Sequence, residues 1–240
     1  MAKTAAILLA GGSGKRMKGT VKDKVLYMLG NMPVIAHSAK AFIESGLVGE
    51  LVFVCRDDVQ QAQIGQIMRQ YFPGAAVSVK FARGGAERQD SVLNGLMEVS
   101  DESAIVFIHD GARPMITKKN VADLYEAAAS DGAAVLASRV SDTIKRLPDS
   151  CKSARNCVLE DLDRGRLWAM QTPQVFVCSR IKAAYERVRE GAIAVTDDVA
   201  AYAISGGKVT VVENGTPNIK ITNPEDIALI QFIKKGQDNE

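Results

Sequence analysis

Apolar runs of strand length alternate with amphipathic stretches of helical period along most of this chain. Short apolar runs bounded by turn residues predict strands at 5–9, 50–55, 76–81, 104–108, 133–137 and 208–213. Apolar residues spaced three and four apart predict helices at 33–45, 59–72, 87–99, 117–129, 181–189, 197–204 and 223–234. Strands joined by helices in this rhythm predict an α/β fold with a mostly parallel, doubly wound sheet.

The stretch from 138 to 171 breaks the alternation, because it has short strand-like pieces and no long helical period. At 240 residues and 47% hydrophobic, the chain suits one large domain over 1–240, in which such a stretch is usually functional or bound elsewhere. We predict that 138–171 is a projecting β-arm. Since an arm cannot bury both of its faces alone, we expect a second subunit to cover it in a two-fold homodimer.

Composition excludes several classes of protein. A formal net charge of +2 is too small for an electrostatic nucleic-acid binder. No leader-like apolar segment is present, and no apolar run approaches the roughly 20 residues of a membrane span. We therefore expect a cytoplasmic protein that binds neither nucleic acid nor membrane. The cysteines form no C-x-x-C pair, so we expect free thiols and no structural zinc at Cys55, Cys151, Cys157 and Cys178.

The first predicted strand ends in a glycine-rich loop. The loop contains no side chain larger than a hydroxymethyl, in the order Ala10, Gly11, Gly12, Ser13 and Gly14. Glycines tolerate positive φ, so we expect successive N–H groups to form an anion-binding concavity. Positive charge follows at Lys15, Arg16, Lys18, Lys22 and Lys24. The loop is interpreted as a phosphate cradle, although it fits neither the dinucleotide fingerprint nor the Walker loop.

Polar residues also follow two other predicted strands, at the edge where an open parallel sheet binds ligands. Gly84 and Gly85 precede Ser91, so their backbone can lie flat against a base, or they can form a plain helix-entry turn. Asp110 can hold ribose hydroxyls or a metal ion, and the Arg113 guanidinium can grip a phosphate. The alternative for these two residues is an ion pair that stabilises its own turn. Further polar residues within apolar stretches of sequence are Thr172 and Lys220, the latter in the strand-like segment 218–222.

Taken together, these segments resemble the 2-C-methyl-D-erythritol 4-phosphate cytidylyltransferase family of the non-mevalonate isoprenoid pathway. The resemblance spans nearly the whole chain, and its eight motifs occur in the family's order. They are AGGSGKRM from Ala10, GG with Arg88 and Ser91, HDGARP from His109, DTIK from Asp142, DR with LW from Asp163, QTPQ from Gln171, TDD from Thr196, and NIKIT from Asn218. The resemblance implies a Rossmann-like nucleotidyltransferase fold.

The reaction implied by the resemblance joins CTP to methylerythritol phosphate and releases pyrophosphate, with Mg2+ on the triphosphate. Carried over by position, Arg16 and Lys24 are the catalytic residues that stabilise the transition state. The nucleotide site comprises Ala10, Gly11, Gly12, Ser13, Gly14, Gly84, Gly85, Ser91, Asp110 and Gly111, with Asp110 also the candidate metal ligand. The methylerythritol phosphate is held by Arg113, Thr143, Arg164, Thr172 and Lys220, of which Thr143 and Arg164 lie on the predicted arm and can reach a neighbour's site.

The chain departs from the family pattern next to the catalytic lysine. Family members usually carry Pro-Lys-Gln, where this chain has Asp23-Lys24-Val25. Lys22 is the competing candidate, and the spacing from Lys24 to Gly30 favours Lys24. Two other functions remain open, namely a ribitol 5-phosphate cytidylyltransferase, which shares the fold and the CTP loops, and a nucleotide-binding regulator without turnover.

Overall fold

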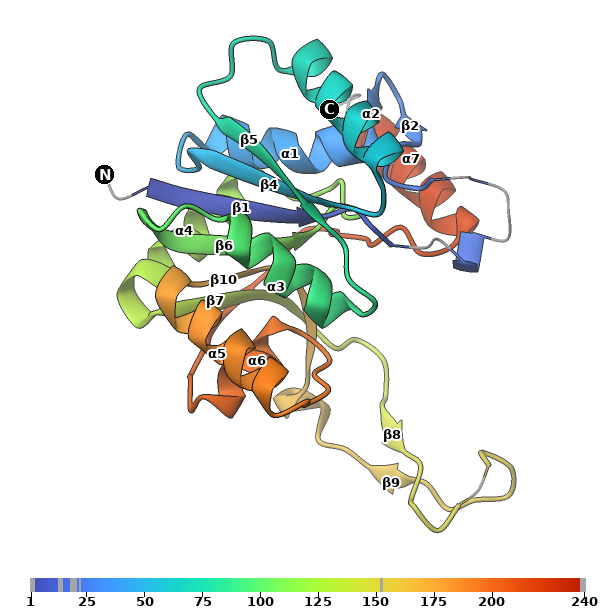
Figure 1. The fold of residues 1–240 in the computed structure, drawn as a ribbon. Coiled ribbons are helices and arrows are strands. Elements are labelled where there is room, and N and C mark those ends of the chain that lie inside the picture. The colour runs from blue at the N-terminus through green and yellow to red at the C-terminus, as the bar shows by residue number, and fades with distance from the viewer. Residues whose placement is uncertain (1–2, 13–14, 18–20, 22, 152, 238–240) are drawn as a thin grey trace.

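A seven-stranded sheet forms the centre of the protein (Figure 1). The computed structural model describes residues 3–12, 15–17, 21, 23–151 and 153–237. The strands of the sheet are β1 (Lys3–Leu9), β4 (Glu50–Cys55), β5 (Ser78–Arg83), β6 (Ser103–Asp110), β7 (Ala133–Arg139), β10 (Trp168–Val177) and β11 (Thr210–Glu213). They are ordered β11-β7-β10-β6-β1-β4-β5. All neighbouring pairs are parallel except the two that involve β10, which confirms the predicted mostly parallel sheet.

Helices cover both faces of the sheet, as a doubly wound fold requires. The first face carries α1 (Val34–Ser45), α2 (Asp58–Tyr71), α4 (Lys118–Asp131) and α7 (Pro224–Gln237). The other face carries α3 (Arg88–Glu98), α5 (Cys178–Glu190) and α6 (Asp198–Ile204). Short elements complete the described chain: η1 (Lys15–Met17), η2 (Arg164–Arg166), β2 (Met28–Leu29), β3 (Met32–Pro33), β8 (Lys145–Arg146) and β9 (Glu160–Asp161). No helix in the described ranges has the length and apolar character to cross a membrane.

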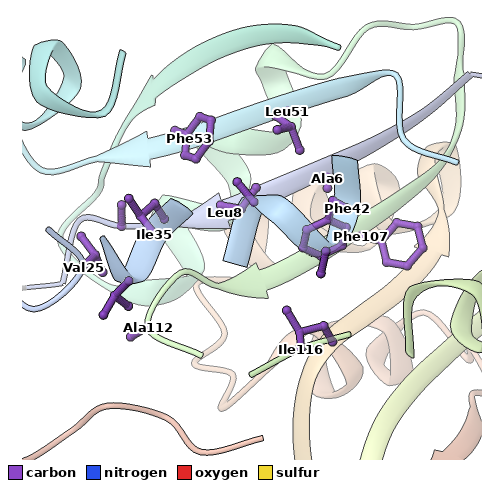
Figure 2. Packing of buried hydrophobic residues seen from close by; sticks show 14 of the residues in the cluster. Ala6, Leu8, Val25, Ile35, Phe42, Leu51, Phe53, Phe107, Ala112 and Ile116 are labelled. Carbon is purple, nitrogen blue, oxygen red and sulfur yellow. The ribbon is translucent and has the colours of Figure 1, made fainter. Parts of the chain in front are cut away.

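The alternation of side chains along β1 divides the core into two layers. Ala6 and Leu8 point into the layer beneath α1, whereas Ala5 and Ile7 point into the layer beneath α3. In the first layer the ring of Phe42 meets that of Phe107 edge to face, with their centroids 5.5 Å apart (Figure 2). A strand that is buried on both faces must be apolar throughout, which is why its sequence is a continuous apolar run.

The predicted elements lie close to the observed ones, with two exceptions. The strand-like segment 218–222 is not a strand, because the Ile221 N–H donates to the Ala112 carbonyl across the site and does not join the ladder. The antiparallel strand β10 has no counterpart among the predicted strands. Pro173 interrupts its sequence pattern, and the register of β10 against β7 shifts between Met170 and Gln174.

The predicted arm begins and ends within the sheet, so its boundaries at 138 and 171 were too wide. Ser138 and Arg139 belong to β7 and pair with Ala169 and Trp168 of β10. The Arg139 guanidinium also lies 3.8 Å from the centre of the Trp168 ring. Between these strands the chain extends away from the sheet and forms the antiparallel pair β8–β9 (Figure 1). We call residues 140–167 the projecting segment.

The prediction of four free thiols is wrong for two of the cysteines. Cys151 and Cys157 of the projecting segment form a disulfide, since the chain turns back on itself there and places their Cα atoms 6.3 Å apart. They are six positions apart in sequence, a spacing outside the C-x-x-C pattern on which the prediction relied. Cys55 and Cys178 are buried free thiols.

Close packing of α3 on the sheet depends on Gly95. A Cβ added there would lie 2.8 Å from Ile7 Cγ2 and 2.9 Å from Val54 Cγ2. We expect Gly95→Ala to lower the free energy of unfolding by about 1–2 kcal/mol, because overpacking exceeds the gain in helix propensity. Chemical denaturation measures this change in the free energy of unfolding. Gly65→Ala in α2 is the matched control, since its Cβ would have no neighbour closer than 3.6 Å. Equal changes in both variants would contradict this explanation.

Candidate active site

A cavity of about 670 Å³ opens where β1, β4, β5 and β6 end. Of the predicted site residues it brings together Ala10, Gly11, Gly12, Arg16, Lys24, Gly85, Ser91, Asp110 and Lys220. It also contains side chains to which no role was assigned from the sequence, namely Arg56, Glu87, Arg88 and Thr222. The rule that places ligands at the carboxyl edge of a parallel sheet therefore located the cavity correctly.

The described part of the glycine loop is held by backbone contacts with β4. The Ala10 N–H donates to the Val54 carbonyl at 2.9 Å. A Cβ on Gly11 would lie 3.2 Å from the backbone nitrogen of Arg56. Neither Gly11 nor Gly12 has a positive φ, so the expected reason for these two glycines is wrong, and close approach of two backbones explains Gly11.

The loop before α3 presents backbone to the cavity. A Cβ on Gly85 would collide with Asp90, whose Cβ is 2.2 Å away, so only glycine fits this turn. Ser91 Oγ accepts a hydrogen bond from Gly85 N–H at 3.0 Å and donates one to the Glu87 carbonyl at 3.1 Å. The hydroxyl keeps a second lone pair that can accept from a ligand. Gly84 lies beside the cavity wall, where its N–H donates to the Cys55 carbonyl at 2.8 Å.

Asp110 is a buried carboxylate surrounded by three cations. Lys220 Nζ lies 2.7 Å from Oδ2, Arg113 Nε 3.6 Å from Oδ2, and Arg88 Nε 3.8 Å from Oδ1. Burial opposes ionisation of this carboxyl, but Lys220, then Arg88 and Arg113, outweigh it and hold the pKa well below its usual range. Asp110 is therefore ionised at neutral pH, and it fixes Lys220 at the cavity wall.

Arg88 is itself fixed from the opposite side by Asp198. Its Nη1 and Nη2 donate to the two carboxylate oxygens of Asp198 at 2.9 and 2.8 Å, and the Tyr185 hydroxyl donates to Oδ1 at 2.5 Å. Burial alone would lower the pKa of Arg88, but Asp198 and then Asp110 raise it further above its ordinary value. The bidentate pair therefore keeps the Arg88 guanidinium protonated and fixed in position at the cavity, with its charge balanced by Asp198.

Lys24 and Arg16 supply the cations that are not neutralised by a neighbouring acid. Lys24 Nζ donates to the Ile221 carbonyl at 2.8 Å. Burial, the nearby Lys220 charge and the Arg16 charge lower the pKa of Lys24. The Arg16 side chain is exposed at η1. Within the residues that the structure describes, no ion pair within 4.0 Å engages either side chain.

The predicted residues Thr172, Arg113 and Gly111 lie behind the cavity wall and support Asp110. Thr172 Oγ1 accepts from the Asp110 N–H at 3.0 Å and donates to His109 Nδ1 at 3.1 Å. Burial lowers the pKa of His109 to about 4, so the ring is neutral at pH 7 and its Nε2–H can donate to the Arg113 carbonyl. The Gly111 N–H donates to the Leu9 carbonyl at 3.0 Å and ties β6 to the start of the glycine loop.

Two predicted residues lie on the projecting segment and do not line this cavity. Thr143 and Arg164 are exposed on the projecting segment, where Arg164 Nη1 donates to the Ser141 carbonyl at 2.7 Å. Ser13 and Gly14 lie outside the described residues, as does Lys22, the alternative to Lys24.

Local patterns carried only a weak signal for the residues that were missed. Arg88 and Asp198 belong to two of the eight motifs that carry the family resemblance. Nothing in the spacing of these motifs indicated that the two residues, 110 positions apart, form a pair. Arg56 follows β4 directly, which is a position the carboxyl-edge rule could have singled out.

Potential metal ligands in the cavity are few. In the described parts of the chain, no three His, Cys, Asp or Glu side chains are grouped so that they could hold a metal ion. Asp110 is the one predicted carboxylate ligand in the cavity, and its Oδ2 is engaged by Lys220. A Mg2+ ion commonly binds through one or two carboxylates, several waters and substrate phosphates. Asp110 therefore fits as a single ligand of an ion that arrives with a polyphosphate.

Comparison with known proteins gives a consistent result over nearly the whole chain. Residues 4–235 match the family model described as 2-C-methyl-D-erythritol 4-phosphate cytidylyltransferase. A protein of that name from Alkaliphilus metalliredigens is 37% identical over 231 residues, which are 96% of this chain and 92% of the relative. The chloroplastic protein of that name from Oryza sativa is 38% identical over 227 residues, 95% of this chain and 73% of the relative.

A solved structure supports the same assignment. The fold matches the crystal structure of 4-diphosphocytidyl-2C-methyl-D-erythritol synthase from Anaerococcus prevotii with a TM-score of 0.83 and 25% identity. The match covers 97% of this chain and 98% of the other. With sequence, fold and cavity in agreement, the chain belongs to the 2-C-methyl-D-erythritol 4-phosphate cytidylyltransferase family.

Proposed function

We propose that the cavity transfers the cytidylyl group of CTP to 2-C-methyl-D-erythritol 4-phosphate and releases pyrophosphate. The observation that carries the proposal is the position of Lys24 and Arg16, two cations that form no ion pair within 4.0 Å among the described residues, at the same cavity as the backbone around Gly11 and Gly85. The backbone suits a nucleotide and the cations suit its phosphates. This is the reaction named by the family to which the chain belongs.

The chemistry needs charge stabilisation more than proton transfer. A phosphate oxygen of the polyol attacks the α-phosphorus of CTP, a new P–O bond forms, and the bond to the bridging oxygen of pyrophosphate breaks. Negative charge grows on the equatorial and leaving oxygens, where fixed cations lower the barrier. The attacking phosphate is already ionised at neutral pH, so no general base is required. The neutral, buried His109 is consistent with this mechanism.

Lys24 and Arg16 are the proposed stabilisers of the transition state. The Lys24 ammonium uses one of its three N–H groups on the Ile221 carbonyl, which leaves two for phosphate oxygens. Its partly buried position favours strong interaction with a developing charge. The Lys24 ammonium lies at the cavity, which supports Lys24 as the catalytic lysine.

The remaining side chains divide between the two substrates. We assign the Gly84–Gly85 backbone and the free lone pair of Ser91 to the cytosine, and Asp110 to the ribose hydroxyls. Lys220 faces the cavity and is assigned to the polyol phosphate. Thr172 and Arg113 act from behind Asp110, and their role is to keep its carboxylate in place. When Mg2+ accompanies the triphosphate, it neutralises phosphate charge, and Asp110 is the side chain that would hold it.

Thr143 and Arg164 lie on the projecting segment and do not line the cavity of their own chain. They can therefore contribute only to a different site. The projecting segment also exposes the apolar side chains Ile144, Leu147, Val158 and Leu159. An exposed apolar patch on a two-stranded hairpin favours cover by another subunit. We therefore propose a two-fold homodimer in which each projecting segment brings Arg164 and Thr143 to the partner's polyol phosphate.

Turnover with two polyol phosphates tests the reaction. With CTP and Mg2+, pyrophosphate release should be strong with methylerythritol phosphate and near background with ribitol 5-phosphate at the same concentration. Release with ribitol phosphate alone would overturn the substrate assignment. CTP binding without release for either compound would favour a regulator without turnover.

The catalytic roles predict separable kinetic effects. Arg16→Ala and Lys24→Ala should each lower kcat by about 100-fold or more, because an interaction specific to the transition state is lost. The dissociation constant for CTP should change much less. Lys118→Ala, at an exposed position on α4, is the control and should leave both values unchanged. An equal loss in binding and turnover would contradict a transition-state role.

Mixing of two inactive variants tests the shared site. In a dimer whose sites combine Arg16 of one chain with Arg164 of the other, subunit exchange between R16A and R164A creates one site with both arginines in each heterodimer. Activity should return to about a quarter of the wild-type value at random exchange. Sedimentation would show dimers at micromolar concentration. A dimer that recovers no activity after proven exchange would place both arginines in one chain.

A further inference from the structure

Gln60 is a fully buried polar residue beneath the glycine loop. It lies in the first turn of α2 and is 0% exposed, as is the apolar Ile64 one turn further on. A buried amide stabilises a structure only when its donors and acceptor find partners. The partners of Gln60 therefore indicate what the side chain does.

The Gln60 amide makes three polar contacts, with Ala10, Asp23 and Arg56. Nε2 donates to the Ala10 carbonyl at 3.2 Å and to Asp23 Oδ2 at 2.7 Å. Oε1 accepts from the Arg56 N–H at 2.7 Å. Ala10 is the first residue of the loop, and Asp23 directly precedes Lys24. One side chain thus ties the start of the glycine loop at Ala10 to Asp23, 13 positions further along the sequence.

Asp23 extends this connection to the lysine. Its Oδ1 accepts from the Val25 N–H at 3.2 Å, and its Oδ2 lies 3.2 Å from Arg56 Nη2. Its carboxylate therefore bridges the backbone on the far side of Lys24 to α2. The Val25 carbonyl in turn accepts from the Ile35 N–H at 2.8 Å at the start of α1. The Lys24 backbone is held between two helices while its ammonium reaches Ile221.

We propose that Gln60 and Asp23 form a positioning pair that fixes the distance between the phosphate-binding backbone at Ala10 and the cation of Lys24. This inference rests on the proposed function, since it names residues that align the same site.

Removal of the amide tests the pair. Gln60→Met keeps the length of the side chain and removes its polar atoms, so the Ala10 carbonyl and Asp23 lose their shared donor. We expect kcat to fall about 10- to 100-fold, because small misplacements of a catalytic group have effects of that size. Gln61→Met, the same change at an exposed position on the same helix, is the control and should leave kcat unchanged.

An exchange of donor and acceptor tests the contact itself. In D23N the side chain keeps a single acceptor oxygen, so it can accept from Gln60 Nε2 or from the Val25 N–H but not from both, and in Q60E two carboxylates face each other. In the double variant the amide introduced at position 23 can again donate to the carboxylate introduced at position 60. We expect the double variant to be at least several-fold more active than the product of the single effects requires. A double variant with simply multiplied losses would overturn the proposal, even if the single variants were unstable.

Proton binding gives a readout that a purely structural role would not produce. In Q60E the new carboxyl faces Asp23 and the backbone N–H of Arg56, the Arg56 guanidinium lies beside Asp23, and the neighbouring Cys55 has a pKa raised to about 12 by burial. While the new carboxyl is protonated, it can still donate to Asp23; once it is ionised, it repels Asp23. The ratio of variant to wild-type kcat should therefore decrease as the pH rises from about 5 to 8. A ratio independent of pH would count against the pair.

Calorimetric binding of CTP separates this inference from the proposed function. Q60M and D23N should bind CTP at least several-fold more weakly than wild type and Q61M, whatever the second substrate is. Wild-type protein that binds CTP but turns over neither polyol phosphate would refute the proposed function and leave this result standing. Wild-type turnover with unchanged CTP binding and kcat in Q60M would refute the positioning pair alone.

Discussion

The parallel pairing of β1 with β4 and β6 is the constraint on which the site depends. Ile7 of β1 is in register with Val52 on one side and with Ile108 on the other. Because the three strands run in the same direction, their carboxyl ends reach one edge of the sheet together. The glycine loop, Arg56 and Asp110 lie at that edge because each stands at the end of its strand or directly after it. The apolar packing of two helical layers therefore determines where the charged groups lie.

Electrostatic compensation also distinguishes the cations that are paired with an acid of the protein from those that are not. Arg88 is neutralised by the buried Asp198, and Lys220 by Asp110. Lys24 contacts a carbonyl instead of an acid. A cation without an acidic partner beside a nucleotide-sized cavity is costly to desolvate, and the bound phosphates of a substrate would relieve that cost. The same logic explains why Gln60, a neutral amide, is suited to join Ala10 and Asp23 without adding charge near Lys24.

Local sequence patterns predicted the alternating strands and helices well. They predicted the segments that break this alternation poorly. Helix α1 follows Pro33 and ends at Gly46, whose φ of 68° suits the left-handed C-cap expected of glycine. In contrast, β10 contains a proline and pairs antiparallel with both of its neighbours, and neither property can be recognised from the residues of one strand. The Cys151–Cys157 disulfide depends likewise on a chain reversal in the projecting segment.

The sequence by itself determined the fold class, the edge of the sheet at which the cavity opens, and half of the residues that line the cavity. These follow from short-range periodicity and from the shared direction of parallel strands, both of which are written into neighbouring residues. Only the tertiary structure decided which charges are paired, as with Arg88 and Asp198, and which polar groups join distant segments, as Gln60 does for Ala10 and Asp23. Such pairings depend on distances between residues far apart in the chain, and no local pattern encodes those distances.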